Sequence, residues 1–535
     1  MDRCARWTGL GVGLALALGL AAAPMLSGCG DDGSATTAET GESGSSSGSG
    51  STQSPLDSSG TSDPTGTAGT AGTTTGPGES SESTAADPCA MSPDPGPAVA
   101  WASYGLDARN SRHNALEAAL TPSTLDCLQP RWSVSGLDGV TSTPAVVDGV
   151  VYVGDWAGAL RAYDLADGRE RWVAEVDAQV NDSPLVTDDA VYFADGGGWL
   201  HAVARADGAP LWSVELDAHE YANIFSSPVL AGDRLVIGVA SIELATVQRD
   251  YTFRGAVVAL DPATGDELWR FYTTTDDAEA GAGVSVWSSA AYDEARGLVY
   301  IGSGNTYEAP ASSLSDALLA IDVLDGSLRW SRQFTEDDVY TIFGEPPQGP
   351  DADVGASPNL FMAGDREVVG VGDKAGVYSV LDRDDGETVW AVMLTPGAHL
   401  GGVMTTAAVD DDTIYVASNT WTDELDWGDP RNTASIFALD AETGDVRWEQ
   451  PVAHPVFGAL TVAGGLVYHG GIEGTVHVRA AEDGTELWTD QPGGDIGGGF
   501  AVAGGHLVVG HGFWFFAEPA QPSGGLVVYG LGAGG

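Results

Sequence analysis

The chain has 535 residues, and its 76 acidic and 22 basic residues give a formal net charge of −54 at pH 7. A surface this acidic repels nucleic acid and anionic lipid head groups, which excludes a nucleic-acid-binding function. The charge does not by itself indicate an acidic active site, and the length alone would be typical of two or three domains.

Residues 1–28 have the pattern of a secretory signal peptide. Arg3 and Arg6 precede an apolar run over 10–23, which is short for a membrane span. The L-S-G-C sequence ending at Cys29 resembles a bacterial lipobox, which implies cleavage before Cys29 and attachment of lipid to its sulfur. Gly30 does not resemble an inner-membrane retention signal, so we expect an outer-membrane anchor, facing the periplasm or the cell surface. The alternative is an ordinary signal peptide with an incidental cysteine.

Residues 29–86 are rich in Ser, Thr and Gly, so we expect a disordered tether before a folded domain over 87–535. With Cys4 in the signal and Cys29 lipidated, Cys89 and Cys127 remain. In an oxidising compartment these two are expected to form a disulfide; two free thiols are the alternative.

A strand–turn–strand unit that ends in tryptophan recurs seven times, at Trp172, Trp212, Trp269, Trp330, Trp390, Trp448 and Trp488. Trp132 stands alone before the first unit, and G-G-L-V-V-Y-G-L follows the last without a tryptophan strand behind it. The N-terminal strand can therefore complete the last unit. The repeat predicts an all-β fold, an eight-bladed β-propeller with four strands in each blade and tryptophans packed between blades.

The unit within 251–307 is the clearest. It predicts a hairpin of strands over 256–261 and 267–271, because apolar β-prone runs flank the turn residues 262–265. Two further strands are expected over 284–292, which Trp287 would open, and over 298–303.

Insertions enlarge four consecutive blades. They fall between second and third strands, or between a fourth strand and the next blade, at 241–251, 272–282, 306–315, 334–354, 395–402 and 419–433. In antiparallel blades all these connections emerge on one rim of the ring. Drift in loop length would scatter insertions over both rims, so we expect a functional rim.

Polar and aromatic residues that the blades do not need lie on this rim: Asp155, Trp156, Glu243, Trp287, Asn305 and Lys374. A carboxylate and an amide oxygen suit Ca²⁺, a lysine can hold a carbonyl oxygen, and an indole can stack on a flat ligand. Each residue also has an ordinary structural explanation. Their shared rim and the scarcity of lysine favour a site.

The chain resembles, over about 101–531, the pyrroloquinoline quinone (PQQ) dehydrogenases, and most nearly their polyvinyl alcohol dehydrogenase branch. The motifs that carry the resemblance are W-A-S-Y-G-L-D-A-R-N-S-R from Trp101, G-D-W-A-G from Gly154, T-F-R-G-A-V-V-A-L-D-P-A-T-G from Thr252, V-W-S-S from Val286, G-S-G-N from Gly302, S-D-A-L-L-A-I-D from Ser315 and G-P-D-A-D-V-G-A-S-P from Gly349.

The resemblance implies an alcohol dehydrogenase that uses PQQ and Ca²⁺. Glu243 and Asn305 would bind Ca²⁺, Trp287 would stack on the quinone, and Lys374 would hold the quinone oxygens. Asp316 would take the proton of the alcohol. Asp155 and Trp156 are further candidate cofactor contacts.

Three departures from the family bear on the cofactor. The sequence has no adjacent cysteine pair and no C-x-x-C-H haem motif, and Thr141 stands where methanol-type enzymes have a glutamate. Electrons would therefore pass to an external acceptor, a cytochrome c or a quinone. We expect a monomer. The second hypothesis is a non-catalytic propeller scaffold, resembling the lipoprotein of the outer-membrane barrel-assembly machinery.

Overall fold

The structure is a computed structural model, and it describes Cys89 and residues 100–247, 250–274, 281–345, 347–422, 429–512 and 524–532. The described residues form 34 strands and two short 3₁₀ helices, η1 (Leu125–Cys127) and η2 (Glu243–Ala245). The signal peptide, Cys29 and the tether lie outside the described residues. No helix among the described residues is long and apolar enough to span a membrane.

The strands form eight sheets, each with four main antiparallel strands, so the predicted eight-bladed propeller is confirmed. Blades 1 to 4 contain β3 (Ala145–Val147), β4 (Val150–Asp155), β5 (Ala159–Asp164), β6 (Glu170–Glu175), β7 (Leu185–Val186), β8 (Ala190–Ala194), β9 (Trp199–Ala204), β10 (Pro210–Glu215), β12 (Val229–Ala231), β13 (Arg234–Ser241), β14 (Ala256–Leu260), β15 (Glu267–Tyr272), β16 (Ala291–Asp293), β17 (Leu298–Gly302), β18 (Ala317–Asp322) and β19 (Leu328–Gln333).

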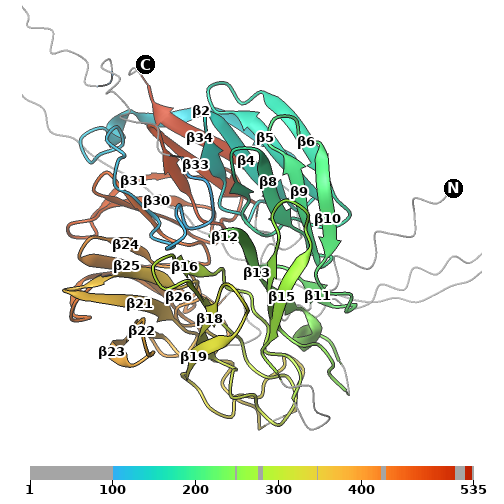
Figure 1. Cartoon of the computed structure of the whole chain (residues 1–535). Coiled ribbons are helices and arrows are strands. Elements are labelled where there is room, and N and C mark those ends of the chain that lie inside the picture. Colours follow the sequence, from blue (N-terminus) through green and yellow to red (C-terminus); the bar gives the residue numbers. More distant parts are fainter. Residues whose placement is uncertain are drawn as a thin grey trace, which may run out of the picture. The chain divides into compact units, whose positions relative to one another are not determined.

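Blades 5 to 8 follow the same order, and only the last is built from both ends of the described chain (Figure 1). They contain β20 (Asn359–Ala363), β21 (Arg366–Gly372), β22 (Val377–Asp382), β23 (Thr388–Met393), β24 (Ala408–Asp410), β25 (Thr413–Thr420), β26 (Thr433–Asp440), β27 (Val446–Val452), β28 (Thr461–Ala463), β29 (Leu466–Gly470), β30 (Val476–Ala480), β31 (Glu486–Asp490), β32 (Ala501–Ala503), β33 (His506–His511), β34 (Gly525–Leu531) and β2 (Leu128–Ser135). Two short strands flank blades 7 and 3, β1 (His113–Asn114) and β11 (Ala222–Asn223).

The ring closes where β2 pairs antiparallel with β34, from Leu128 opposite Leu531 to Ser135 opposite Gly525. In Figure 1 the blue-green β2 lies against the red β34. The N-terminal strand therefore completes the last blade, as the sequence predicts. Because β2 completes the last blade, the ring contains no incomplete blade whose open strand edge another chain could extend.

The repeat tryptophans join neighbouring blades. The indole Nε1 of Trp132 donates to the carbonyl of Leu165 in blade 1 at 2.8 Å, and a Cβ on Gly168 would lie 2.7 Å from the same ring. Gly168 has φ +72°, so glycine serves both the turn and the close approach of the indole. The same donation recurs at Trp172, Trp212, Trp269, Trp330, Trp390 and Trp448.

The hairpin expected over 256–261 and 267–271 is confirmed as β14 and β15. The strand expected over 284–292 is wrong for most of its length, because β16 covers only Ala291–Asp293. Residues 284–290 instead bond to a strand of the preceding blade and to another connection: the N–H of Val286 donates to Val239 O in β13 at 3.1 Å, and that of Val284 to Asn305 O at 2.9 Å. Trp287 therefore lies in an inter-blade connection.

Residues 101–114 run across the innermost strands of several blades. Backbone N–H groups of six blades donate to carbonyls of this segment: Val146 to Trp101, Val186 to Ala102, Tyr292 to Ala108, Leu360 to Arg109, Val409 to Ser111 and Val462 to Arg112, at 2.7–3.0 Å. The segment therefore ties these blades together at the axis of the ring.

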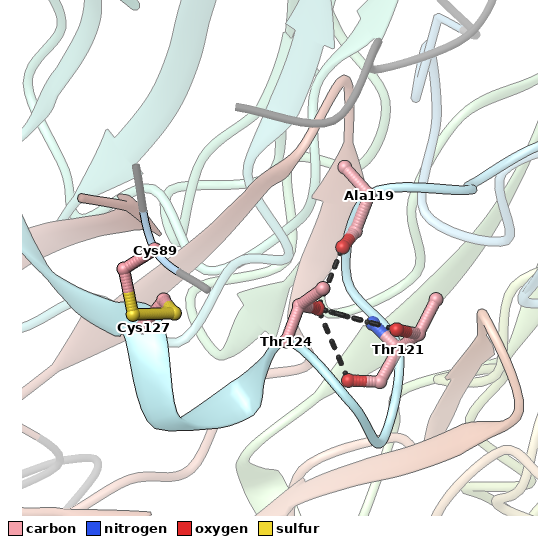
Figure 2. Close-up of a disulfide and its surroundings, with 5 residues drawn as sticks. All are labelled: Cys89, Ala119, Thr121, Thr124 and Cys127. Carbon is pink, nitrogen blue, oxygen red and sulfur yellow. Dashed lines mark hydrogen bonds between the residues drawn. A yellow bond between two sulfur atoms is a disulfide. The ribbon is translucent and has the colours of Figure 1, made fainter. Parts of the chain in front are cut away.

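Cys89 and Cys127 form the predicted disulfide across 38 residues (Figure 2). Cys127 ends η1, immediately before β2, and Thr124 steadies the turn ahead of it by donating to Ala119 O at 2.7 Å. The bond therefore attaches Cys89 to the start of the strand that closes the ring.

Candidate functional site

A cavity of about 370 Å³ lies on the rim that carries the insertions. The described residues of its wall come from all eight connections between successive blades and from connections between second and third strands, as expected for that rim. Tyr104, from the segment 101–114, also lines it. The volume lies within the range of small-molecule sites.

Two indoles line the cavity, those of Trp287 and Trp156. Trp156 is held by donation from its Nε1 to Thr141 Oγ1 at 3.0 Å. Gly355 lies close against Trp287, since a Cβ there would come within 1.7 Å of the indole Cη2. The wall can therefore accommodate a flat aromatic ligand, with the position of the Trp287 ring set by Gly355.

Gly355→Ala is expected to weaken binding of such a ligand at least tenfold, because the added methyl forces the Trp287 indole into the cavity. The measurement is a titration that follows quenching of tryptophan fluorescence. Gly196→Ala is the matched control, since its Cβ would come no closer than 3.1 Å to Gln179. Equal affinities for wild type and Gly355→Ala would contradict this packing role.

Lys374 is the only lysine of the chain; the other 21 basic residues are arginines. It lines the cavity, and its Nζ lies 3.0 Å from Asp351 Oδ1, 2.8 Å from Asp353 Oδ2 and 5.8 Å from the centre of the Trp287 ring. Burial disfavours the ammonium, but attraction to Asp351 and Asp353 raises the pKa of Lys374 above its ordinary value. The ammonium is therefore held charged beside an aromatic wall.

Three carboxyls surround this lysine. Asp351 and Asp353 line the cavity, and Asp338 lies buried behind them, accepting the N–H of Ala352 at 2.7 Å. Burial raises the pKa of Asp351 to about 8, with a further contribution from Asp353, although Lys374 lowers it. Burial also raises the pKa of Asp338. Because one ammonium faces three carboxyls, the cluster can hold and release a proton near neutral pH.

The structure brings Asn305 to the cavity wall. Its N–H donates to Asp353 Oδ1 at 2.6 Å, and its Nδ2 donates to the carbonyls of Thr306 and Tyr340 at 2.8 and 2.7 Å. These bonds connect Asn305 directly to the carboxylate that holds Lys374.

Glu243, the other expected calcium ligand, is buried in η2 but is not among the described residues that line the cavity. Its carboxylate accepts the N–H groups of Thr252 and Phe253 at 3.1 and 2.9 Å, and Oε1 lies 3.5 Å from His219 Nε2. In the described part of the chain no three acidic, histidine or cysteine side chains converge on one cation position. Binding of Ca²⁺ by Glu243 and Asn305 therefore stays a prediction, and we derive no step from calcium.

Asp155 and Asp316 lie outside the described cavity wall. The Asp155 carboxylate turns to Arg161 Nε at 2.6 Å and to the N–H of Ala159 at 3.0 Å. Asp316 is fully buried, and neither of its oxygens has a hydrogen-bond partner among the described residues. Burial raises the pKa of Asp316 to about 10, with smaller contributions from Asp353 and Asp338.

Asp316→Asn is expected to change how stability depends on pH. Between about pH 4 and pH 10 the folded wild type holds one more proton at Asp316 than the unfolded chain, so its free energy of unfolding falls as pH rises. The variant lacks this loss, which amounts to at most about 1.4 kcal/mol per pH unit. In thermal unfolding, the melting temperature of the variant relative to that of wild type should therefore be higher at pH 9 than at pH 5. Parallel pH curves would contradict a protonated Asp316.

Two further polar atoms of the wall have no hydrogen-bond partner among the described residues, Asn181 Nδ2 and Thr405 Oγ1. Such buried atoms are normally satisfied, and both are placed to bond to a ligand or a water in the cavity. The sequence analysis missed them, as it missed roles for Asp351 and Asp353. The closely spaced acids in G-P-D-A-D-V-G were the available signal for the latter pair.

Two family models match the chain. Residues 213–400 match the model of the β-propeller domain of glucose, ethanol and alcohol dehydrogenases, named PQQ. Residues 127–251 and 373–493 match the model of the outer membrane protein assembly factor BamB, named PQQ_2.

The chain is 34% identical over 296 residues to a polyvinylalcohol dehydrogenase of Pseudomonas sp., which covers 49% of this chain and 46% of that protein. It is 34% identical over 271 residues to a polyvinylalcohol dehydrogenase of Sphingopyxis sp. (strain 113P3), with 44% and 40% covered. The chain thus spans less than half the length of these curated relatives.

Among solved structures, the quinohemoprotein alcohol dehydrogenase from Comamonas testosteroni superposes with a TM-score of 0.69 over 82% of this chain and 81% of that chain. At 18% identity this likeness shows the fold alone. Taken with the match of residues 213–400 and with the polyvinylalcohol dehydrogenase relatives, it leads to one conclusion: the chain carries a β-propeller domain of the PQQ family.

Proposed function

We propose that this protein is a PQQ-dependent alcohol dehydrogenase that oxidises an alcohol, with secondary and polymeric alcohols as the first substrates to test. The observation that carries the proposal is the arrangement of the only lysine of the chain, between Asp351 and Asp353 and beside Trp287, in a cavity of about 370 Å³. The relatedness to polyvinylalcohol dehydrogenases supports the same reaction class.

The wall fits PQQ in three respects. The indoles of Trp287 and Trp156 suit a flat ring system, Lys374 suits a carbonyl oxygen, and the unpartnered Asn181 Nδ2 suits an acceptor atom of a ligand. When bound, PQQ supplies an electrophilic quinone carbonyl that accepts hydride from the alcohol carbon. The chain's own residues bind and orient the reactants and hold the proton.

Asp351 is the proposed general base. It lines the cavity, and its raised pKa of about 8 suits a group that takes a proton from a hydroxyl near neutral pH. Lys374 and Asp353 position it through the ion pairs described above. Asp316, the candidate from the sequence, is buried and does not line the described cavity, so this proposal gives it no direct contact with the alcohol.

The test uses the purified full chain. PQQ is added, binding is followed by quenching of tryptophan fluorescence, and reduction of a dye is measured with primary, secondary and polymeric alcohols. Each assay is repeated with added Ca²⁺ and with a chelator, because calcium dependence remains a separate proposal implied by the family. Binding together with alcohol-dependent dye reduction is expected. No binding and no reduction in either arm would end the proposal.

A non-catalytic scaffold is the second candidate, favoured by the match of two segments to the BamB model. It predicts co-purification with barrel-assembly proteins and no PQQ binding. A scaffold role does not explain why Lys374 is paired with two carboxylates inside a cavity, so this hypothesis is placed second.

The remaining parts of the proposal concern partners and location. The sequence contains no C-x-x-C-H motif, so we propose an external cytochrome c or quinone as electron acceptor for a monomeric enzyme. We also propose a lipid anchor at Cys29 in the outer membrane. Mass spectrometry of the mature N-terminus and loss of detergent partitioning in Cys29→Ser test the anchor.

A further inference from the structure

Arg112 is a fully buried cation without a carboxylate partner among the described residues. Its guanidinium donates to neutral groups: the carbonyls of Leu460, Phe500 and Tyr104 and the hydroxyls of Thr461 and Thr143. Its Cζ lies 5.4 Å from the ring centre of Trp101 and 5.1 Å from that of Tyr104. Burial lowers the pKa of Arg112 to about 10, so it stays charged at neutral pH.

This charge lies directly behind the cavity wall. Tyr104 and Gly499 both line the cavity, and a Cβ on Gly499 would come within 2.5 Å of Arg112 Nη2. Gly499 therefore lines the cavity and also lies close against the guanidinium. The Tyr104 ring rests on the guanidinium, and its hydroxyl is fixed to Thr406 Oγ1 at 2.6 Å.

A buried, unpaired charge is costly, and an opposite charge nearby offsets that cost. The rest of the cavity does not supply one at this position, because Asp351 and Asp353 are engaged with Lys374. An anionic group of the ligand, placed against Tyr104 and Gly499, would offset the positive charge of Arg112.

We propose that Arg112 is a positioning residue that directs a carboxylate end of the cavity's ligand toward the part of the wall formed by Tyr104 and Gly499. The ligand class is thereby narrowed to flat aromatic carboxylates. The inference rests on the proposed function, in which the ligand is PQQ, a tricarboxylic acid. Its carboxylate-bearing end would face Arg112, and its uncharged quinone carbonyls would face Lys374, away from the field of Arg112.

The test compares PQQ with its trimethyl ester, which has the same ring system without the negative charges. Affinities are measured by tryptophan quenching in wild type, Arg112→Met, Arg112→Gln and Arg112→Lys. Arg383→Met is the matched control, because Arg383 is also buried but pairs with Asp293 at 3.1 Å and does not line the described cavity. Circular dichroism establishes that each variant is folded.

Wild type, Arg112→Lys and Arg383→Met are expected to bind the acid about tenfold or more tightly than the ester. In Arg112→Met this preference should fall to about twofold or less, mainly through weaker binding of the acid. If Arg112→Met does not fold, Arg112→Gln, which keeps hydrogen-bond donors but no charge, decides the matter in the same way.

Equal affinities of wild type for acid and ester, or an undiminished preference in the folded neutral variant, would overturn the inference and leave the proposed function intact. Failure of wild type to bind either compound would instead count against the proposed function itself.

Discussion

Replacing Lys374 by methionine is expected to abolish PQQ-dependent alcohol oxidation and to lower the free energy of unfolding by about 3–5 kcal/mol. The variant leaves Asp351 and Asp353 buried without the ammonium that pairs with both. It also removes the cation nearest Trp287. Dye reduction with added PQQ measures the first effect, and urea unfolding measures the second.

Lys374→Arg separates charge from shape. The chain uses arginine at 21 positions and lysine only here, which indicates that a compact ammonium is needed. The arginine variant should therefore recover part of the stability while remaining at least tenfold less active than wild type. Activity of Lys374→Met within tenfold of wild type would contradict a role for this lysine in the reaction.

Since no other lysine is present, ¹⁵N-lysine labelling should give one side-chain signal, which shifts when PQQ binds.

Asp351→Asn is expected to lower kcat by about 10²–10⁴-fold while PQQ affinity stays within a few-fold of wild type, because only the proton acceptor is lost. A base must be deprotonated to act. The kcat/KM of wild type should therefore rise with pH through about 8, the raised pKa of Asp351. The rise should be missing in Asp351→Asn.

Asp353→Asn is the matched control for this assignment. Asp353 contacts Lys374 and the N–H of Asn305, so its loss should weaken positioning and lower kcat while the rise with pH remains. Loss of activity in Asp316→Asn combined with a fully active Asp351→Asn would transfer the role of base back to Asp316.

The fold could be read from the sequence because its signal is local and repeated. The same turn glycine and the same tryptophan recur from blade to blade, and a pair such as Gly168 and Trp132 joins one blade to the next. The unmatched Trp132 strand also predicted how the ring closes, and the strand-to-strand alternation placed every insertion on one rim. These features follow from chain order alone, so they required no knowledge of side-chain directions.

The site required the folded chain, because its residues are set by directions and neighbours that lie far apart in the sequence. The sequence determined that Trp287, Asn305 and Lys374 belong to one rim, and the structure places all three on the cavity wall. Only the tertiary structure decided that the carboxylates of Glu243 and Asp155 turn toward local donors, since a nearby N–H or guanidinium satisfies them first. It also decided that Asp351 and Asp353, within a long insertion without periodic pattern, fold back onto Lys374, and that Arg112 lies behind Gly499. Spacing along the chain indicates which edge a side chain occupies, whereas its charge partner depends on how separate blades pack around the axis.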